Sequence, residues 1–193
     1  MTKQITLLAL AYFLGAIPFG VLIAKAKGVD LQKFGSGNTG ATNVFRALGL
    51  VAGGTAFLAD GAKGYLACWL MNWFLPDQYL MITLAGAFAL IGHSYSLFLK
   101  GKGGKGAATG VGIMLFLAPV ITLIIAITVA VLIFTTRYVS LATLTAATLT
   151  PVLFIIYRQP TEYLFLAVVA GVFIWYKHIA NMKRLVVGTE NKI

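Results

Sequence analysis

The chain is a series of long apolar stretches separated by short polar segments. Stretches of about 20 apolar residues cross the hydrocarbon core of a bilayer as a helix. They occur near residues 4–24, 51–75, 79–99, 119–136, 139–157 and 161–179. None of them alternates polar and apolar residues with the period of two that a membrane β-strand shows. The pattern therefore predicts an all-α, polytopic membrane protein with at least six transmembrane helices.

A seventh apolar stretch, Gly106 to Ala118, has 13 residues and ends at Pro119. It is either a short, half-buried helix or the first half of one long helix. Lys and Arg are enriched on the cytoplasmic side of membrane proteins. If this stretch crosses the membrane, 12 cations lie on one side and only Lys3 and Arg158 on the other; if it does not, the division is 8 to 6. We therefore predict seven transmembrane helices, with the N-terminus outside and the C-terminus cytoplasmic.

The composition agrees with a membrane protein, since 60% of the residues are hydrophobic, 10% are charged and the mean hydropathy is +0.91. Lys3 precedes the first apolar stretch, but that stretch contains Pro18 and leads directly into Lys25 and Lys27, so we expect a retained helix rather than a secretory signal. Linkers and internal repeats are absent, which favours one domain, 1–193.

The formal net charge of +10 would favour nucleic acid as a partner if it lay on the surface of a soluble domain. In a chain this apolar, the cations belong to loops and helix ends. We therefore expect anionic lipid headgroups and phosphorylated substrates as partners, and no nucleic acid.

Three polar segments, 34–46, 100–109 and 178–184, fall on the same face in the seven-helix topology. The first combines glycines, neutral hydrogen-bonding side chains and a guanidinium: Gly35, Ser36, Gly37, Asn38, Thr39, Gly40, Thr42, Asn43 and Arg46. Glycines let the backbone approach a ligand closely, and the segment leads into a predicted helix whose N-terminal amides suit a phosphate. The alternative is an ordinary polar turn between helices.

The second segment places three lysines and four glycines within residues 100–106. It is not a nucleotide-binding P-loop, because Leu99 and Gly106 occupy the positions of the first glycine and of the Ser or Thr in that motif. Glycine amides beside Lys102 and Lys105 nevertheless predict an anion-binding nest. The alternative is a cytoplasmic anchor without a ligand, although an anchor needs no glycines.

In the third segment, His178 and Asn181 are three residues apart and Arg184 follows at the same spacing, so a helix would present them on one face. The imidazole could bind a hydroxyl or a phosphate, or accept a proton. The alternative is interfacial snorkelling and helix capping.

Ionisable residues also lie within the apolar stretches. Asp60 and Lys63 are three residues apart, which predicts a structural ion pair, with a role in positioning the polar loops as the alternative. His93 precedes the lysine loop by seven residues and either braces that loop or packs between helices. The sequence has no paired Cys or His ligands and no carboxylate cluster, so we expect neither a metal nor a cofactor.

The strings GSGNTGATNVFR, KGKGGKGAAT and HIANMKRLVVGTE closely resemble segments of the bacterial membrane acyl-phosphate:glycerol-3-phosphate acyltransferases, and the similarity extends over essentially the whole chain. The resemblance implies transfer of a fatty acyl group from acyl phosphate to the sn-1 hydroxyl of glycerol 3-phosphate. The products are 1-acylglycerol 3-phosphate (lysophosphatidate) and inorganic phosphate, in bacterial phospholipid synthesis. It further implies a seven-helix enzyme of the bacterial cytoplasmic (inner) membrane whose active site faces the cytoplasm. We expect a monomer surrounded by membrane lipids.

The resemblance also assigns site residues. The catalytic residues are expected to be Ser36, Arg46, Lys105, His178 and Asn181. The substrate-binding residues are expected to be Gly35, Gly37, Asn38, Thr42, Asn43, Gly103, Gly104, Gly106, Ser140 and Thr143. Lys102 departs from the family pattern, where an apolar or aromatic residue is expected. Lys105, Arg46 and the glycine-rich amides would bind phosphates, while small polar side chains orient the glycerol backbone or the developing oxyanion.

Two questions stay open at the level of sequence. The proton of the attacking hydroxyl could pass to His178 or to a phosphate oxygen of the donor. A transporter for phosphate or a phosphorylated solute is the main alternative, and it would require polar residues deep in several helices and matching broken helices. Only Asp60 and Lys63 lie deep. A purely structural membrane protein would leave the first polar segment unexplained.

Overall fold

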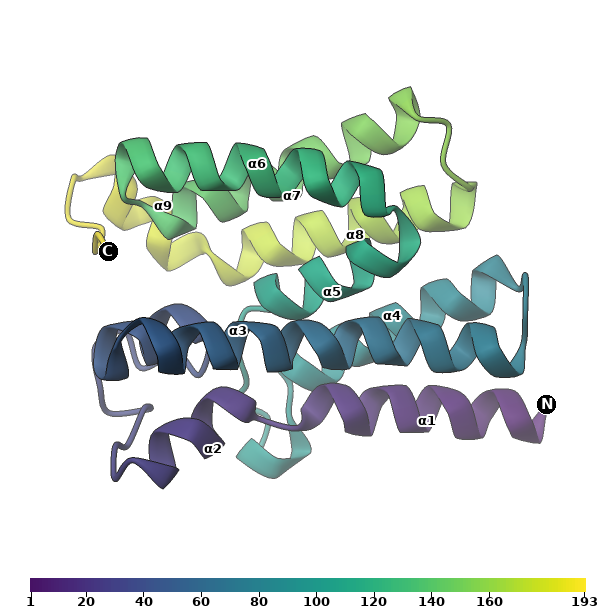
Figure 1. The fold of residues 1–193 in the computed structure, drawn as a ribbon, viewed down its shortest axis with the longest axis horizontal. Coiled ribbons are helices and arrows are strands. Elements are labelled where there is room, and N and C mark those ends of the chain that lie inside the picture. Colours follow the sequence, from purple (N-terminus) through teal and green to yellow (C-terminus); the bar gives the residue numbers. More distant parts are fainter. The chain divides into compact units, whose positions relative to one another are not determined.

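The computed structural model describes residues 1–193 and contains helices as its only regular secondary structure, so the all-α prediction is confirmed. The chain forms two compact units, Met1–Leu117 and Ala118–Ile193 (Figure 1). The first unit contains α1 (Thr2–Ala16), α2 (Phe19–Ala26), α3 (Ala41–Phe74), α4 (Tyr79–Ser94), the 3₁₀ helix η1 (Leu97–Leu99) and α5 (Ala107–Leu117). The second contains α6 (Pro119–Thr136), α7 (Val139–Ile156), α8 (Thr161–Lys177) and α9 (Ile179–Val186).

Helices of bilayer-spanning length coincide with the six clear apolar stretches of the sequence. Five helical segments are long and apolar enough to cross a membrane, and the bent pair α8 and α9 makes a sixth if it counts as one span. The seventh candidate, α5, has only 11 residues, a length of about 16 Å. Ala118 separates it from α6 with φ −151° and ψ 74°. The stretch is therefore a short helix, and the alternative of one long helix through Pro119 was wrong.

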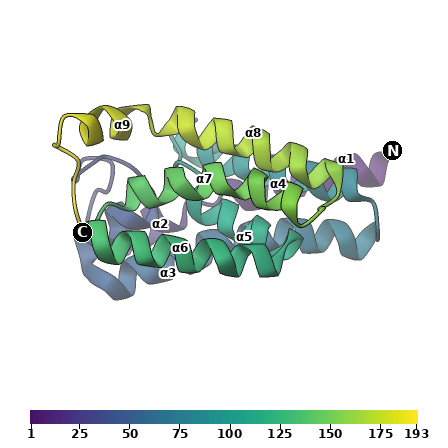
Figure 2. The same cartoon turned by 90° about the horizontal axis from the view of Figure 1, so that it is seen from above.

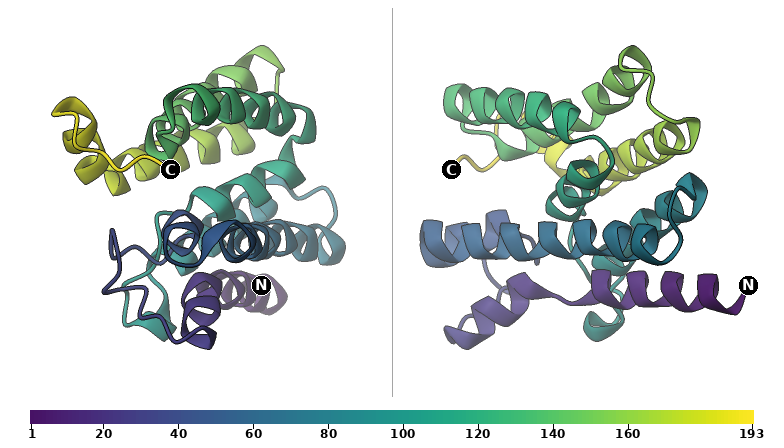
Figure 3. Two further views of the ribbon diagram at one scale, coloured as in Figure 1. Left: turned by 60° about the vertical axis from the view of Figure 1, so that its left-hand side comes forward. Right: turned by 45° about the vertical axis from the view of Figure 1, so that its right-hand side comes forward.

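The first apolar stretch is broken between α1 and α2, at Ile17 and Pro18 (Figure 3). Proline has no N–H, and a break in a membrane helix leaves carbonyls that water cannot reach. Side chains supply the missing donors: Lys63 Nζ donates to Ile17 O at 2.7 Å, and Ser96 Oγ donates to Ala16 O at 2.6 Å. The break is thus stabilised from α3 and from the segment that follows α4.

Glycines at helix crossings bring the backbones of the first unit close together. α1 packs against α4, and α3 packs against α5. A Cβ atom added at Gly15, Gly64, Gly92 or Gly112 would overlap the main chain of the opposite helix. Association in lipid depends on such close contact, because the tails are as apolar as the side chains. The helices on either side of the lysine-rich loop are therefore held tightly against α1 and α3.

The second unit is built on α7, against which α6, α8 and α9 pack. The Trp175 indole of α8 donates from Nε1 to Thr148 Oγ1 of α7 at 3.2 Å. The chain bends by 60° between α8 and α9 (Figure 2). His178 lies at this bend, as the last residue before α9. It therefore occupies a helix break rather than a continuous helix face.

Candidate active site

The loop that precedes α3 is organised by Asn43, whose side chain is 2% exposed. Its Nδ2 atom donates to Leu31 O at 3.1 Å and to Phe34 O at 2.9 Å, while its Oδ1 atom accepts the Ser36 N–H at 3.2 Å. Leu31 is buried as well and packs in a small apolar core with residues of α2 and α3. Asn43 therefore uses its carboxamide within the loop and fixes the position of Ser36.

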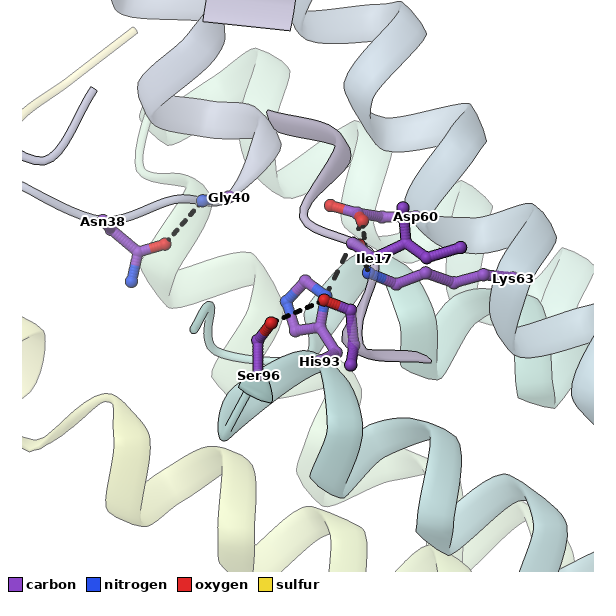
Figure 4. Close-up of polar contacts among 8 residues, drawn as sticks. Ile17, Asn38, Gly40, Asp60, Lys63, His93 and Ser96 are labelled. Atoms are coloured by element: carbon purple, nitrogen blue, oxygen red, sulfur yellow. Dashed lines mark hydrogen bonds and ion pairs between the residues drawn. The ribbon is translucent and has the colours of Figure 1, made fainter. Parts of the chain in front are cut away.

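Ser36 lies between two glycines with positive φ, Gly35 at +55° and Gly37 at +68°, a backbone conformation that favours glycine. Its side chain is exposed. The Asn38 carboxamide folds back onto the loop, where Oδ1 accepts the Gly40 N–H at 2.8 Å (Figure 4). The turn thus presents the Ser36 hydroxyl at the surface on a backbone that two asparagines constrain.

The N-terminus of α3 follows this turn directly. The N-cap residue, Gly40, offers no side-chain acceptor to the first-turn amides. Such amides carry the positive end of the helix dipole and are suited to an anion. Thr42 and Arg46 are four residues apart, on one face of the first turns, and both are partly exposed. The first segment therefore combines a hydroxyl, helix-terminal amides and a guanidinium.

Main-chain hydrogen bonds join the lysine-rich loop to the end of α4. The Gly103 N–H donates to Ser94 O at 3.2 Å, and the Gly104 N–H donates to His93 O at 3.1 Å. These amides, which the sequence suggested as donors to an anion, are directed into the protein. A Cβ atom at either glycine would overlap His93 or Ser94. The two glycines therefore give the loop its shape and its tight fit on α4.

The two central lysines of the loop differ in their surroundings. Lys102 is exposed, whereas Lys105 is half-buried and lies two residues before the start of α5. Gly106, between Lys105 and α5, has φ +86° and is buried. The loop therefore holds one cation in a defined place at the entrance to a helix and leaves the other in solvent.

The predicted ion pair inside α3 is confirmed. Lys63 Nζ lies 2.7 Å from Asp60 Oδ1, and both side chains are almost completely buried. His93 Nδ1 of α4 lies 3.7 Å from the same carboxylate oxygen (Figure 4). A buried ion pair contributes little net stability, because desolvation offsets most of the attraction.

In the second unit, the Glu190 carboxylate accepts hydrogen bonds from side chains of two helices, α7 and α9. Its Oε1 atom accepts hydrogen bonds from Ser140 Oγ at 3.0 Å and Asn181 Nδ2 at 2.6 Å. Its Oε2 atom accepts one from Arg184 Nε at 2.7 Å. Burial alone would raise the pKa of Glu190, but the bonds from Asn181, Arg184 and Ser140 outweigh burial and hold that pKa below its ordinary value. The carboxylate stays ionised and ties α9 to the start of α7.

His178 is oriented by the helix that it ends. Its Nδ1 atom lies 2.8 Å from Ile174 O, a carbonyl one turn earlier in α8. A carbonyl accepts only, so this contact places a proton on Nδ1 and, in the neutral ring, makes Nε2 the basic nitrogen. The imidazole is 5% exposed. The geometry suits a group that accepts a proton through Nε2.

The predicted site residues fall in both units. Ser36, Arg46 and Lys105 belong to the first, and His178, Asn181, Ser140 and Thr143 to the second. Ser140 and Asn181 both donate hydrogen bonds to Glu190. Glu190 was not predicted as a site residue. The signal that could have found it is the rarity of acidic residues, of which the chain has only five. Thr143 Oγ1 donates to Val139 O within its own helix. No group of three His, Cys, Asp or Glu side chains is arranged to hold a metal ion.

Bilayer-length helices that carry basic, glycine-rich loops define an integral membrane protein with segments suited to anionic ligands. The family model described as glycerol-3-phosphate acyltransferase matches residues 5–188, and the chain belongs to that family.

Relatives of the same description are similar over nearly their whole length. The Fusobacterium nucleatum glycerol-3-phosphate acyltransferase is 44% identical over 96% of this chain and 95% of its own. That of Bacillus subtilis is 39% identical over 97% and 96%, respectively.

Two solved structures share the fold. The crystal structure of PlsY (YgiH), an integral membrane glycerol 3-phosphate acyltransferase, in its glycerol 3-phosphate form matches with a TM-score of 0.95 and 38% identity, over 99% of this chain and 96% of that one. The lysophosphatidic acid form of the same protein matches with a TM-score of 0.93 and 37% identity, over 99% and 95%.

Proposed function

We propose that this protein transfers a fatty acyl group from acyl phosphate to the sn-1 hydroxyl of glycerol 3-phosphate. The products are 1-acylglycerol 3-phosphate (lysophosphatidate) and inorganic phosphate, and the reaction serves bacterial phospholipid synthesis. The observation that carries the proposal is the match, at a TM-score of 0.95 over 99% of the chain, to an acyltransferase solved with glycerol 3-phosphate. The two basic, glycine-rich segments at helix N-termini supply the groups that this chemistry requires.

The reaction needs positioning more than activation. An acyl phosphate is a mixed anhydride with a good leaving group. The glycerol hydroxyl oxygen attacks the acyl carbonyl carbon, the bond between that carbon and the phosphate oxygen breaks, and inorganic phosphate leaves. The protein must hold two anionic phosphates and orient one hydroxyl. Cations, helix-terminal amides and small hydroxyls suffice for these tasks.

The side chains of the first unit supply most of the binding groups. Lys105 and Arg46 bind phosphate oxygens, assisted by the amides at the start of α3. The exposed Ser36 hydroxyl and the Thr42 hydroxyl orient the glycerol backbone or the developing oxyanion. Asn38 and Asn43 act by constraining the turn, since their carboxamides bond its main chain. Gly103, Gly104 and Gly106 act through the shape of the lysine loop.

From the second unit we propose His178 and Asn181 as catalytic residues. We treat residues 1–193 as one functional domain, because the family model matches residues 5–188, which include both units. His178 Nε2 accepts the hydroxyl proton, or the leaving phosphate does; a phosphate oxygen is itself basic enough for that role. Asn181 and Ser140 contribute by shaping the α7–α9 surface around Glu190. Thr143, three residues after Ser140 on α7, is kept as a substrate-binding candidate. The enzyme acts as a monomer among membrane lipids.

The proposed topology has seven transmembrane helices, with the N-terminus outside and both polar loops and the C-terminus in the cytoplasm, in the bacterial inner membrane. The charge distribution, 12 cations against 2, supports it. The short helix α5, at about 16 Å, crosses a core of about 30 Å only if polar segments at its ends reach into the membrane.

The topology makes a prediction about two exposed cations, Lys102 and Arg158. Each is replaced by cysteine in a Cys68→Ala background, because Cys68 is the only native thiol. A membrane-impermeant maleimide applied to intact spheroplasts should label the cysteine at position 158 and leave that at position 102 unlabelled until the membrane is permeabilised. If both cysteines are labelled in intact spheroplasts, or if both are labelled only after permeabilisation, the two positions lie on the same side of the membrane. Either result would mean that α5 does not cross it.

The activity itself is tested with purified protein in detergent or lipid. Palmitoyl phosphate is supplied with and without glycerol 3-phosphate; released phosphate is measured and lysophosphatidate is identified by mass. We expect phosphate release that depends on glycerol 3-phosphate and equals the lysophosphatidate formed. A folded sample that is inactive with acyl phosphate, acyl-CoA and acyl carrier protein donors would contradict the proposal.

A further inference from the structure

Three ionisable side chains meet inside the first unit (Figure 4). Asp60 of α3 contacts Lys63 at 2.7 Å and His93 of α4 at 3.7 Å. Lys63 also donates to Ile17 O, at the break between α1 and α2. The cluster of Asp60, Lys63 and His93 therefore joins three helical segments at one point inside the membrane-spanning part of the protein.

His93 connects this cluster to the lysine loop in two ways. Its carbonyl accepts the Gly104 N–H at 3.1 Å. Its ring lies directly against Gly104, because a Cβ atom at that glycine would overlap Nε2 and crowd both neighbouring ring carbons. Nδ1, on the other side of the ring, faces Asp60. The imidazole thus lies between the buried carboxylate and the residue immediately before Lys105.

We propose that Asp60 and His93 are positioning residues for the lysine loop, with the carboxylate fixing the imidazole and the imidazole fixing Gly104 and hence Lys105. This inference rests on the proposed function only in taking Lys105 as a phosphate-binding group. Lys63 has a different part: it balances the charge of Asp60 and holds the broken first helix against the cluster.

Packing alone does not require charged groups at this place. An apolar side chain of similar volume would fill the same space without the cost of desolvating a carboxylate and an ammonium. The Asp60 carboxylate lies 3.7 Å from His93 Nδ1, beyond hydrogen-bond length, so it acts on the imidazole through its charge. That charge favours the ring orientation in which an Nδ1–H faces the carboxylate, and an apolar side chain would have no such effect. A ring held in one orientation presents a fixed surface to the loop. Small displacements of a binding group are costly to catalysis.

The test removes side-chain volume at His93 and adds it at Gly104, the two residues in contact. His93→Asn keeps a donor near the Nδ1 position but removes the part of the ring that touches Gly104. Gly104→Ala adds a methyl group where the ring stands. The two are combined in a double variant, in which the methyl group enters the space that the ring has left. Thr83→Val is the matched control, because Thr83 is also buried in α4 but lies ten residues before His93, about 15 Å along the helix.

We expect His93→Asn to lower kcat/KM by about 10- to 100-fold, chiefly through KM for the phosphate-bearing substrates. Gly104→Ala should lower kcat/KM further than His93→Asn does. The double variant should have a kcat/KM about tenfold higher than that of Gly104→Ala, since contacting residues are energetically coupled. Thr83→Val should shift the melting temperature without changing either KM. A kcat/KM of His93→Asn equal to that of wild type, or a double variant no better than Gly104→Ala, would overturn the positioning role.

Amide hydrogen exchange separates this inference from the proposed function. His93→Asn should accelerate exchange in peptides that cover residues 100–106 and leave residues 34–46 unchanged, whether or not the protein turns over acyl phosphate. Accelerated loop exchange in a protein without acyltransferase activity would refute the function and retain the positioning role. Unchanged loop exchange in an active enzyme would refute the positioning role alone.

Discussion

Lys105→Ala is expected to lower kcat/KM by about 100- to 1000-fold, the loss typical of removing one charge-stabilising group from an active site. Lys105 is the half-buried cation of its loop and lies at the entrance to α5, where the helix dipole also favours an anion. Without its ammonium group, only Arg46 and neutral donors would remain to bind the two phosphates. The measurement is phosphate release from palmitoyl phosphate, with lysophosphatidate quantified by mass.

Lys102→Ala is the matched control for that prediction. It removes the same charge from the same loop, three residues earlier, but its side chain is exposed and its field is screened by salt. We expect less than about a threefold change, since an exposed charge contributes little. Both variants should melt within a few degrees of wild type. Equal losses in the two variants would show that the loop acts by overall charge, and near-normal activity of Lys105→Ala would refute the phosphate-binding assignment.

The helical architecture followed from the sequence because the bilayer reduces the choice of structures. Backbone groups inside a membrane must be paired within a helix or a closed barrel, so length and apolarity alone locate the helices. The same reasoning does not locate breaks. The partners of the freed carbonyls at Ala16 and Ile17 are Ser96 and Lys63, which come from 80 and 46 residues further along the chain. Such partners depend on tertiary packing.

The polar segments could be recognised from their composition, but the direction of each hydrogen-bonding group could not. Gly103 and Gly104 were expected to offer amides to an anion, and their amides instead bond the end of α4. Whether a loop amide points outward depends on the neighbouring backbone. Spacing did identify the contact between Asp60 and Lys63, because residues three apart on a helix are neighbours whatever surrounds them.

Glu190 illustrates a further limit of the sequence. Its three partners, Ser140, Asn181 and Arg184, lie at separations of 50, 9 and 6 residues. Ser140 had been selected as a site residue through the family resemblance, and Asn181 through the helix face that it shares with His178. A lone acid near the end of a basic segment gives no indication that it is buried, and only the packing of α9 against α7 makes it a shared acceptor.

Glu190→Gln is expected to destabilise the second unit by about 2–4 kcal/mol, because it replaces a buried anionic acceptor of three hydrogen bonds with a neutral amide that brings donors of its own. The free energy of unfolding is measured by titration with SDS in mixed micelles. Glu162→Gln makes the same change at the partly exposed start of α8, where only the helix dipole is affected, and should cost less than about 1 kcal/mol. Equal costs for the two variants would contradict the role of Glu190 as a shared acceptor.

The pH dependence of the stability difference between wild type and Glu190→Gln tests whether the carboxylate charge is its source. The pKa of Glu190 is held below its ordinary value of 4.5 in the folded protein, so its ionisation favours folding at any pH above 4.5. As the pH falls below 4.5, the unfolded chain binds the proton first, and the contribution of Glu190 is lost through the lower, folded pKa. The stability difference between wild type and Glu190→Gln should therefore be constant near neutrality and shrink on acidification. A difference that stays the same down to pH 3 would mean that shape, and not charge, holds α9 in place.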